Sequence, residues 1–496
     1  MRQFAIALIL LSAAFFAWVL GSESDEIGPR DIAVLTATFA LILSIQVSLM
    51  FLINTFLKSY LPRQRELVLI VATAILLGAN AYFMAFYTLE QTTEFRIACA
   101  AVVGVVFLVL MMYSPARPVL ILFAAVMLVA SLAQYVYGRV TFVPKDVTAD
   151  TISLPLKSDR NVYLIGTESL HSPLAYRELY GFDTPEFVKV LEAAGFRVLD
   201  GFSADRSTLK TFAAIFEFKR SLQHDDRGVR SAFLNDNSTF RSFRDAGYGI
   251  QVIYKNNYFS VHEGNVDHFY PPKESFEACG EMGPMFFYGL CREPVVNYIN
   301  KHVLRATRLK PRESIEHFRK RADIAMESPR PWLTWIHVHF PSHTNGYYKY
   351  PDAEYIKNYS RRLKEEFPEV AENMRKTAVY IAEKDPNAVI VVFGDHGTHF
   401  YRGITKDQVF TDKPLAPPRN VLLDHNGTML AVYPADFCVN RIKDGFSTKA
   451  LIENIIACLN GNDSPTEAER KRARTVTFFN ELHDVEDLLS SSMAQH

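Results

Sequence analysis

The strongest indication of a fold comes from the stretch Ala388-Val389-Ile390-Val391-Val392-Phe393-Gly394-Asp395-His396-Gly397. Its first part is an unbroken run of β-forming residues, which is typical of a strand buried in an α/β sheet. The glycine then turns the chain, so Asp395 and His396 follow the strand at its carboxyl end, where open α/β sheets bind their ligands. A carboxylate beside a neutral imidazole can hold one divalent metal ion. A solvated turn uses the same dipeptides, so this stretch alone leaves both interpretations open.

The region around this stretch alternates predicted strands with predicted helices. Strands are predicted over residues 161–166, 249–254, 332–337, 388–393 and 428–433, and helices over 184–194 and 368–384. Strands separated by helices favour a mostly parallel sheet that is covered on both faces. The sequence therefore predicts an α/β domain over residues 161–496.

The first part of the chain has a different composition, dominated by apolar residues up to about residue 140. A membrane-spanning helix needs ~20 apolar residues, with a range of about 17 to 25. Five stretches meet or approach that length, at about residues 4–20, 32–53, 67–87, 97–113 and 119–137. We therefore expect a five-helix transmembrane domain over residues 1–140, followed by a linker over residues 141–160.

The charges in the loops predict the orientation of these spans. The second-to-third loop is basic, with Lys58, Arg63 and Arg65, whereas the first-to-second loop is acidic over residues 23–31. Because basic loops stay in the cytoplasm, the large carboxyl-terminal domain is expected outside it. The first span could instead be a cleaved signal peptide, which would leave that location unchanged. The balance of 53 basic and 54 acidic residues argues against a nucleic-acid-binding protein.

Four of the five cysteines fall in the predicted exported part of the chain, and the fifth, Cys99, lies in the fourth span. Four cysteines allow three sets of pairings. The simplest set is local, Cys279–Cys291 with Cys438–Cys458, and an oxidising compartment would permit it. Four buried free thiols are the alternative.

Two further segments carry side chains that could reach the same ion. Glu168 follows the 161–166 strand, although a helix start also favours an acidic residue. Thr208 begins an apolar helical run for which Ser203 and Asp205 are candidate caps. A hydroxyl in the first turn of a helix lies among unpaired amides, and a metal ion would make it a nucleophile. Its alternative role is that of a helix cap.

Together these segments resemble the alkaline phosphatase superfamily, in its membrane-bound branch of lipid A phosphoethanolamine transferases and lipoteichoic acid synthases. That resemblance covers nearly the whole chain and implies five transmembrane helices followed by an alkaline phosphatase-like (sulfatase-like) α/β/α domain. By position it places one zinc or manganese ion on Glu168, Thr208, Asp395 and His396, with a second ion possible, and it makes Thr208 the transiently phosphorylated residue. Ser207 is the neighbouring candidate for that nucleophile.

A second segment, over residues 335–351, resembles a phosphoethanolamine-transferase motif and implies that His343 contacts the phosphoryl group. His337 and His339 alternate along the preceding strand and are expected to face a packed interior. The family has another histidine after its Asp-His-Gly motif, for which His399 or His425 could substitute here. Arg206, Ser207, His399 and His425 are the candidate substrate-binding residues.

The resemblance implies that a phosphoethanolamine or phosphoglycerol head group passes from a membrane phospholipid to an envelope glycan or glycolipid. It also implies a multi-pass protein of the bacterial inner membrane with its catalytic domain in the periplasm or outside. A phosphodiesterase or sulfatase-type hydrolase on the same fold is the first alternative. A membrane scaffold without catalytic activity is the second.

Overall fold

The structure is a computed structural model, and its chain divides into two compact units, Met1–Val147 with Glu274–Arg308, and Thr148–Lys273 with Leu309–His496. It describes residues 6, 8–14, 16–17, 29–88, 101–102, 105–110, 112–113, 116–141, 158–217, 233, 237–254, 265–270, 311–338, 340–341, 353–398, 401, 406–409, 418–479 and 481–490.

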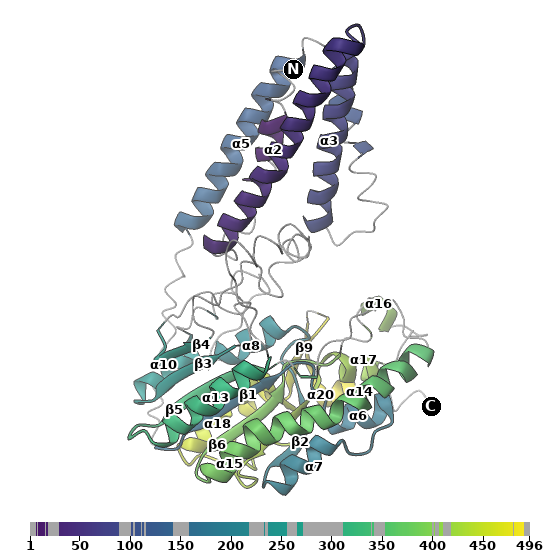
Figure 1. The fold of residues 1–496 in the computed structure, drawn as a ribbon. Helices are drawn as coiled ribbons and strands as arrows, with labels where there is room; N and C mark the ends of the chain where they lie inside the picture. The colour runs from purple at the N-terminus through teal and green to yellow at the C-terminus, as the bar shows by residue number, and fades with distance from the viewer. Residues whose placement is uncertain are drawn as a thin grey trace. The chain divides into compact units, whose positions relative to one another are not determined.

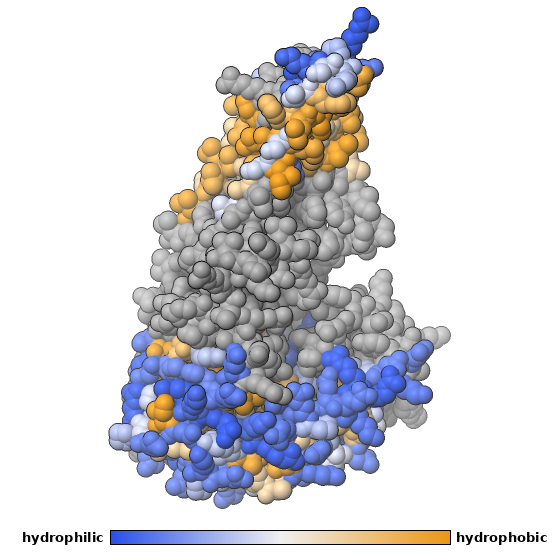
Figure 2. Space-filling model, viewed as in Figure 1, coloured by the Kyte–Doolittle hydropathy of each residue, from blue (hydrophilic) through white to orange (hydrophobic). Residues whose placement is uncertain are grey.

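The described part of the first unit is helical. Its long helices are α2 (Pro29–Tyr60), α3 (Arg65–Thr88) and α5 (Ala116–Thr141), which contain the second, third and fifth of the predicted spans. Further helical residues lie within 6–17 and 101–112. Large apolar side chains are exposed along these helices, and Figure 2 shows much of their surface as hydrophobic. Within the described residues, however, no helix has both the length and the apolar character that crossing a membrane requires. The five-span domain stays a prediction.

The second unit is built on one eight-stranded sheet in the order β4-β3-β5-β1-β6-β7-β2-β8. The strands are β1 (Val162–Thr167), β2 (Arg197–Phe202), β3 (Gly249–Ile253), β4 (His268–Tyr270), β5 (Trp332–Val338), β6 (Val389–Gly394), β7 (Gly427–Tyr433) and β8 (Phe446–Ser447). All neighbours are parallel except β7, which is antiparallel to both β6 and β2. The predicted α/β class with a mostly parallel sheet is therefore confirmed, and the five predicted strands lie within one residue of the observed bounds.

Helices cover both faces of this sheet (Figure 1). The helices are α6 (Pro173–Tyr180), α7 (Glu186–Ala193), α8 (Thr208–Phe216), α10 (Ser238–Asp245), α13 (Pro311–Met326), α14 (Ala353–Met374), α15 (Tyr380–Lys384), α16 (Lys406–Val409), α17 (Pro418–His425), α18 (Leu451–Leu459), α19 (Glu467–Arg472) and α20 (Val485–Ser490). Short helical turns η3 (Arg375–Val379) and η4 (Thr448–Ala450) and the hairpin β9 (Thr475–Phe478) with β10 (Glu481–Asp484) complete the unit.

Successive side chains of the central strands point to opposite faces of the sheet, so the core has two layers. On one face, buried residues of β1, β5 and β6 such as Ile165 share a cluster with residues of α7, α13 and α14. On the other face, Phe212 and Phe216 of α8 pack against Trp335 of β5, with ring centroids 4.9 and 4.5 Å apart. This second layer fixes the position of α8, the helix that begins at Thr208.

The predicted start of the 368–384 helix is wrong. The helix begins at Ala353 and contains Pro368 in its interior, then passes through the π-helical turn η3 into α15. Pro368 is favourable in a first turn, which is why the sequence placed the start there. Tyr359, Leu363 and Phe367 are buried in the core, and this packing carries the helix through the proline.

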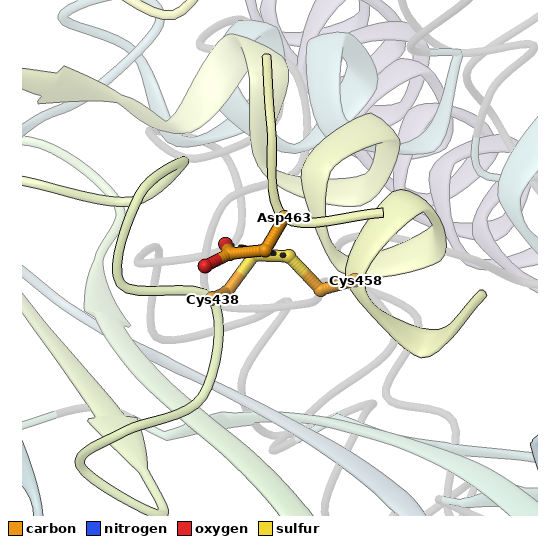
Figure 3. Close-up of side chains that lie close together, drawn as sticks. All are labelled: Cys438, Cys458 and Asp463. Atoms are coloured by element: carbon orange, nitrogen blue, oxygen red, sulfur yellow. Dashed lines mark hydrogen bonds between the residues drawn. A yellow bond between two sulfur atoms is a disulfide. The ribbon is translucent and has the colours of Figure 1, made fainter. Parts of the chain in front are cut away.

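One of the two local cysteine pairings is present as a disulfide between Cys438 and Cys458, which are 20 residues apart (Figure 3). Asp463 lies beside the bridge and accepts a hydrogen bond from the Asn440 side chain at 2.7 Å. Because both sulfurs are used in the bond, neither is a thiolate that could bind a metal ion. The pairing predicted for Cys279 and Cys291 lies outside the described residues.

Candidate metal centre

The neighbouring strands β5, β1 and β6 bring their carboxyl ends to one edge of the sheet. They are parallel, and Thr167 at the end of β1 lies opposite Gly394 at the end of β6. The hydrogen-bond ladder continues one residue further, because Glu168 N–H donates to Val338 at 3.0 Å and Asp395 N–H donates to Thr167 at 2.9 Å. The two carboxylates are thereby held next to each other by backbone bonds.

Glu168, Asp395 and His396 form a buried cluster whose ligand atoms all lie within 4.8 Å of one another. Nε2 of His396 is 3.5 Å from Glu168 Oε1 and 3.5 Å from Asp395 Oδ2. The hydroxyl of Thr208, the first residue of α8, lies 2.9 Å from the same Nε2. The structure thus brings together the four residues expected to hold the ion, and their role as ligands stays a prediction.

Hydrogen bonds to the backbone fix which atoms of this cluster face one another. Asp395 Oδ1 accepts from the amides of Ser169 at 2.9 Å and His396 at 2.7 Å, so Oδ2 remains on the inner side of the cluster. His396 Nδ1 lies 2.6 Å from the carbonyl oxygen of Gly397. Because a carbonyl only accepts, Nδ1 carries a proton, and Nε2 is the nitrogen that faces the cluster and can bind an ion.

These residues fit a divalent ion. Ligands about 2 Å from a tetrahedral ion lie roughly 3.3 Å from one another, close to the 3.5 Å separations at His396. Asp395 Oδ2 has no hydrogen-bond partner among the described residues although it is fully buried. Two buried carboxylates repel each other, and a bound cation would remove that repulsion. One imidazole nitrogen, two carboxylates and a hydroxyl suit zinc or manganese.

The other predicted site residues lie in different surroundings. Ser207 is half-buried and caps α8 without a side-chain hydrogen bond, and Arg206 is exposed. His425 is buried at the end of α17, where burial and the charge of Arg206 lower its pKa to about 3, so its imidazole is neutral. His343 and His399 lie outside the described residues.

The predicted caps of α8 are wrong. Its N-cap is Ser207, and neither Ser203 nor Asp205 occupies that position. Both side chains instead bond within the loop before the helix: the Ser203 hydroxyl donates to Asp205 O, and Asp205 Oδ1 accepts from Ser207 N–H at 3.1 Å. These bonds shape the loop that delivers Thr208 to the cluster.

Sequence reasoning treated His337 as a core residue without a role in the site. It is fully buried, yet its Nε2 lies 3.5 Å from Glu168 Oε2 and 3.7 Å from Asp395 Oδ2. The β1–β5 register places it opposite Gly166, two residues before Glu168. The available signal was its position next to the carboxyl end of β5, but the adjacency of β5 and β1 is not visible in the sequence.

A second buried polar group supports the loop that follows His396. The Thr398 hydroxyl donates to Asp424 Oδ1 at 2.8 Å and lies 2.7 Å from the hydroxyl of Tyr180. His171 Nδ1–H donates to Gly427 O at 2.9 Å, and its Nε2 lies 3.0 Å from Thr398 Oγ1. Hydrogen bonds therefore join the loop that follows His396 to β7 and α17.

The burial of His171 predicts how the stability of the fold depends on pH. Burial lowers the pKa of His171 to about 4, below its ordinary value of about 6.5. Between these values the unfolded chain binds a proton at this residue that the folded chain does not. His171 alone should therefore lower the free energy of unfolding by about 1.4 kcal/mol per pH unit as the pH falls from 6.5 to 4, and the buried His425 adds to that slope. Denaturant unfolding at several pH values should show a shallower fall in His171→Asn, and equal slopes would contradict the assignment.

Comparisons with known proteins give distant structural matches. Neither protein-family profiles nor curated protein sequences match the chain. Among solved structures, the C-terminal periplasmic domain of EcEptC from Escherichia coli is 14% identical, with 68% of this chain and 95% of that chain covered and a TM-score of 0.40. The integral membrane protein lipooligosaccharide phosphoethanolamine transferase A from Neisseria meningitidis is 12% identical, with 95% and 98% covered and a TM-score of 0.38. A protein in the alkaline phosphatase superfamily from Vibrio parahaemolyticus is 14% identical, with 65% and 74% covered and a TM-score of 0.37.

Proposed function

We propose that the chain is a metal-dependent transferase that moves a phosphoethanolamine or phosphoglycerol head group from a membrane phospholipid to an envelope glycan or glycolipid. The observation that carries this proposal is the Thr208 hydroxyl, which begins a helix and lies 2.9 Å from His396 Nε2 beside two buried carboxylates. That combination supplies a nucleophile, a cation site and a helix amino terminus at one point.

In the first half of the reaction Thr208 takes the head-group phosphate from the donor, and in the second half it passes that group to the acceptor. Its oxygen attacks the phosphorus of the donor, the bond from phosphorus to the diacylglycerol oxygen breaks, and diacylglycerol takes up the proton that the hydroxyl loses. The hydroxyl of the acceptor then attacks the phospho-threonine, and its proton returns to the Thr208 oxygen. A divalent ion held by Glu168, Asp395, His396 and Thr208 would lower the hydroxyl pKa and stabilise charge on the phosphoryl oxygens.

The remaining residues bind and orient the phosphoryl group. The first amides of α8 have no partner inside the helix, because the intrahelical bonds begin with Thr211 N–H donating to Ser207 O at 2.8 Å. These amides and the positive end of the helix dipole favour an anion. Arg206 and His425, whose pKa the charge of Arg206 lowers, are candidate contacts, and His343 is assigned to the phosphoryl group by the sequence resemblance.

In this function the apolar amino-terminal helices would hold the catalytic domain at the membrane. A phospholipid donor stays in the bilayer, so a catalytic domain tethered to the membrane meets it at high effective concentration. We place the protein in the bacterial inner membrane with the Thr148–Lys273 and Leu309–His496 unit in the periplasm. A soluble substrate would need no such tether.

The test uses the full chain in vesicles of phosphatidylethanolamine labelled in the ethanolamine, with a parallel set of labelled phosphatidylglycerol. Without an acceptor, we expect at most one diacylglycerol released per chain, with the label retained on the protein. Adding a bacterial envelope glycan fraction should release the label into that fraction. Continuous release of free phosphoethanolamine or phosphoglycerol without an acceptor would instead identify a hydrolase. No diacylglycerol from either lipid, in chains shown to contain metal, would overturn the proposal.

A further inference from the structure

We infer that His337 is a positioning residue for the metal centre, a role that rests on the proposed function and extends it beyond the four ligands. The Nε2 atom of His337 lies 3.5 Å from Glu168 Oε2 and 3.7 Å from Asp395 Oδ2. The inference follows from how the oxygens of Glu168 are divided between the two imidazoles.

Glu168 lies between two histidines, and each of its oxygens faces a different one. Oε1 is 3.5 Å from His396 Nε2, and Oε2 is 3.5 Å from His337 Nε2. All three side chains are at most 1% exposed. If Oε1 binds the ion beside His396, Oε2 is left facing His337, whose Nε2–H can hold it. Such a bond orients a ligand carboxylate and is typical of the residues around metal sites.

Asp395 is placed differently, because one of its oxygens faces both histidines. Its Oδ1 is held by two backbone amides, whereas Oδ2 lies 3.5 Å from His396 and 3.7 Å from His337. His337 thus reaches both carboxylates from one nitrogen. Its distances to them are longer than a hydrogen bond, which requires about 3.2 Å or less, so a shift of a few tenths of an ångström decides which oxygen it holds.

His337 also contacts α8, the helix that begins with the proposed nucleophile Thr208. Its ring packs edge-on against Phe212, with centroids 4.9 Å apart and an interplanar angle of 79°. Phe212 is four residues after Thr208 in α8 and therefore lies on the same side of that helix. A Cβ on Gly166 would lie 3.1 Å from Phe212 and 3.6 Å from His337. The absence of a side chain at this position therefore leaves space for both rings.

At this site, the described residues whose ligand atoms lie close enough to share one ion are Glu168, Asp395 and His396, and His337 is not among them. His337 is therefore assigned to holding the carboxylates and not to the ion itself. A positioning role predicts weaker metal binding in its absence, with the chemistry recovered when metal is in excess.

The experiment measures zinc and manganese affinity of the full chain by competition with a chromogenic chelator, and the unfolding midpoint of the same samples. His337→Leu should weaken binding by about 10- to 100-fold. His337→Gln, whose amide reaches the position of Nε2, should recover most of that loss. The control is His483→Leu in the β9–β10 hairpin, which should bind as the wild type does. With saturating metal, His337→Leu should regain phospholipid-dependent formation of the protein adduct.

Three outcomes would overturn the inference, and a fourth would overturn the proposed function instead. Affinity in His337→Leu equal to that of the control overturns it, as does an adduct rate that excess metal does not restore. If His337→Leu does not fold, His337→Asn takes its place, because its shorter amide cannot reach the carboxylates and must show the same loss. Wild-type affinity in His337→Asn then overturns the inference. A wild-type chain that binds neither ion would instead overturn the proposed function, so the two failures are distinguishable.

Discussion

Replacing Thr208 with alanine is expected to abolish head-group transfer, with a loss on the order of 10⁴-fold or more, because no other group can take over a missing nucleophile. The folded state should lose only about 1 kcal/mol, the usual contribution of a hydroxyl at a helix start. Thr208 bonds to His396 and is the first residue of α8, so its removal leaves the core packing of Phe212 and Phe216 intact. Activity should be measured at saturating metal, since the variant also loses one ligand.

The matched control is Ser207→Ala, one residue earlier. Ser207 is the N-cap, but its side chain makes no capping hydrogen bond, so this variant should keep its activity within a few-fold. Thr208→Ser keeps a hydroxyl and should retain part of the activity. Intact-mass analysis and peptide mapping after incubation with phospholipid should find the head-group phosphate on Thr208. An adduct on Ser207, or full activity in Thr208→Ala, would contradict the assigned nucleophile.

The parts of the fold that local pattern encodes were predictable from the sequence. β6 is a continuous apolar strand, and its burial on both faces is what such a run predicts. Glu168, Asp395 and His396 lie two or three residues after the ends of predicted strands, so their common edge follows from a parallel sheet. Thr208 was found as the first residue of a helical run. Each of these inferences needs only residues that are neighbours along the chain.

The parts that depend on tertiary contacts were not predictable. The role of His337 depends on β5 lying beside β1, and strand order in a sheet is not written in any local pattern. The start of α14 was misplaced because Pro368 is locally a helix-start residue, whereas burial of the residues before it extends the helix. The antiparallel placement of β7 and the hydrogen bonds from His171 to the loop after His396 likewise join distant segments.

Gly397 should be among the least tolerant positions of the site, and Gly397→Ala should cost about 3 kcal/mol of unfolding free energy or more. A Cβ there would lie 1.8 Å from the carbonyl oxygen of Asp424, 2.6 Å from its carbonyl carbon and 2.9 Å from the His171 ring. Overpacking costs typically about 1 to 3 kcal/mol, and the upper end applies because backbone atoms cannot move aside as a side chain can. Denaturant unfolding of the full chain measures this effect.

The same substitution should also weaken metal binding, because the Gly397 carbonyl accepts the hydrogen bond that orients His396. Moving that carbonyl turns the imidazole and takes Nε2 away from the cluster, so we expect a loss of about 10- to 100-fold in zinc affinity. Gly247→Ala is the control, since its φ of +87° strains an alanine while nothing lies within 4 Å of the added Cβ. It should lose about 1 kcal/mol of stability and keep its metal affinity. Metal binding in Gly397→Ala equal to that of Gly247→Ala would show that the backbone at Gly397 does not orient His396.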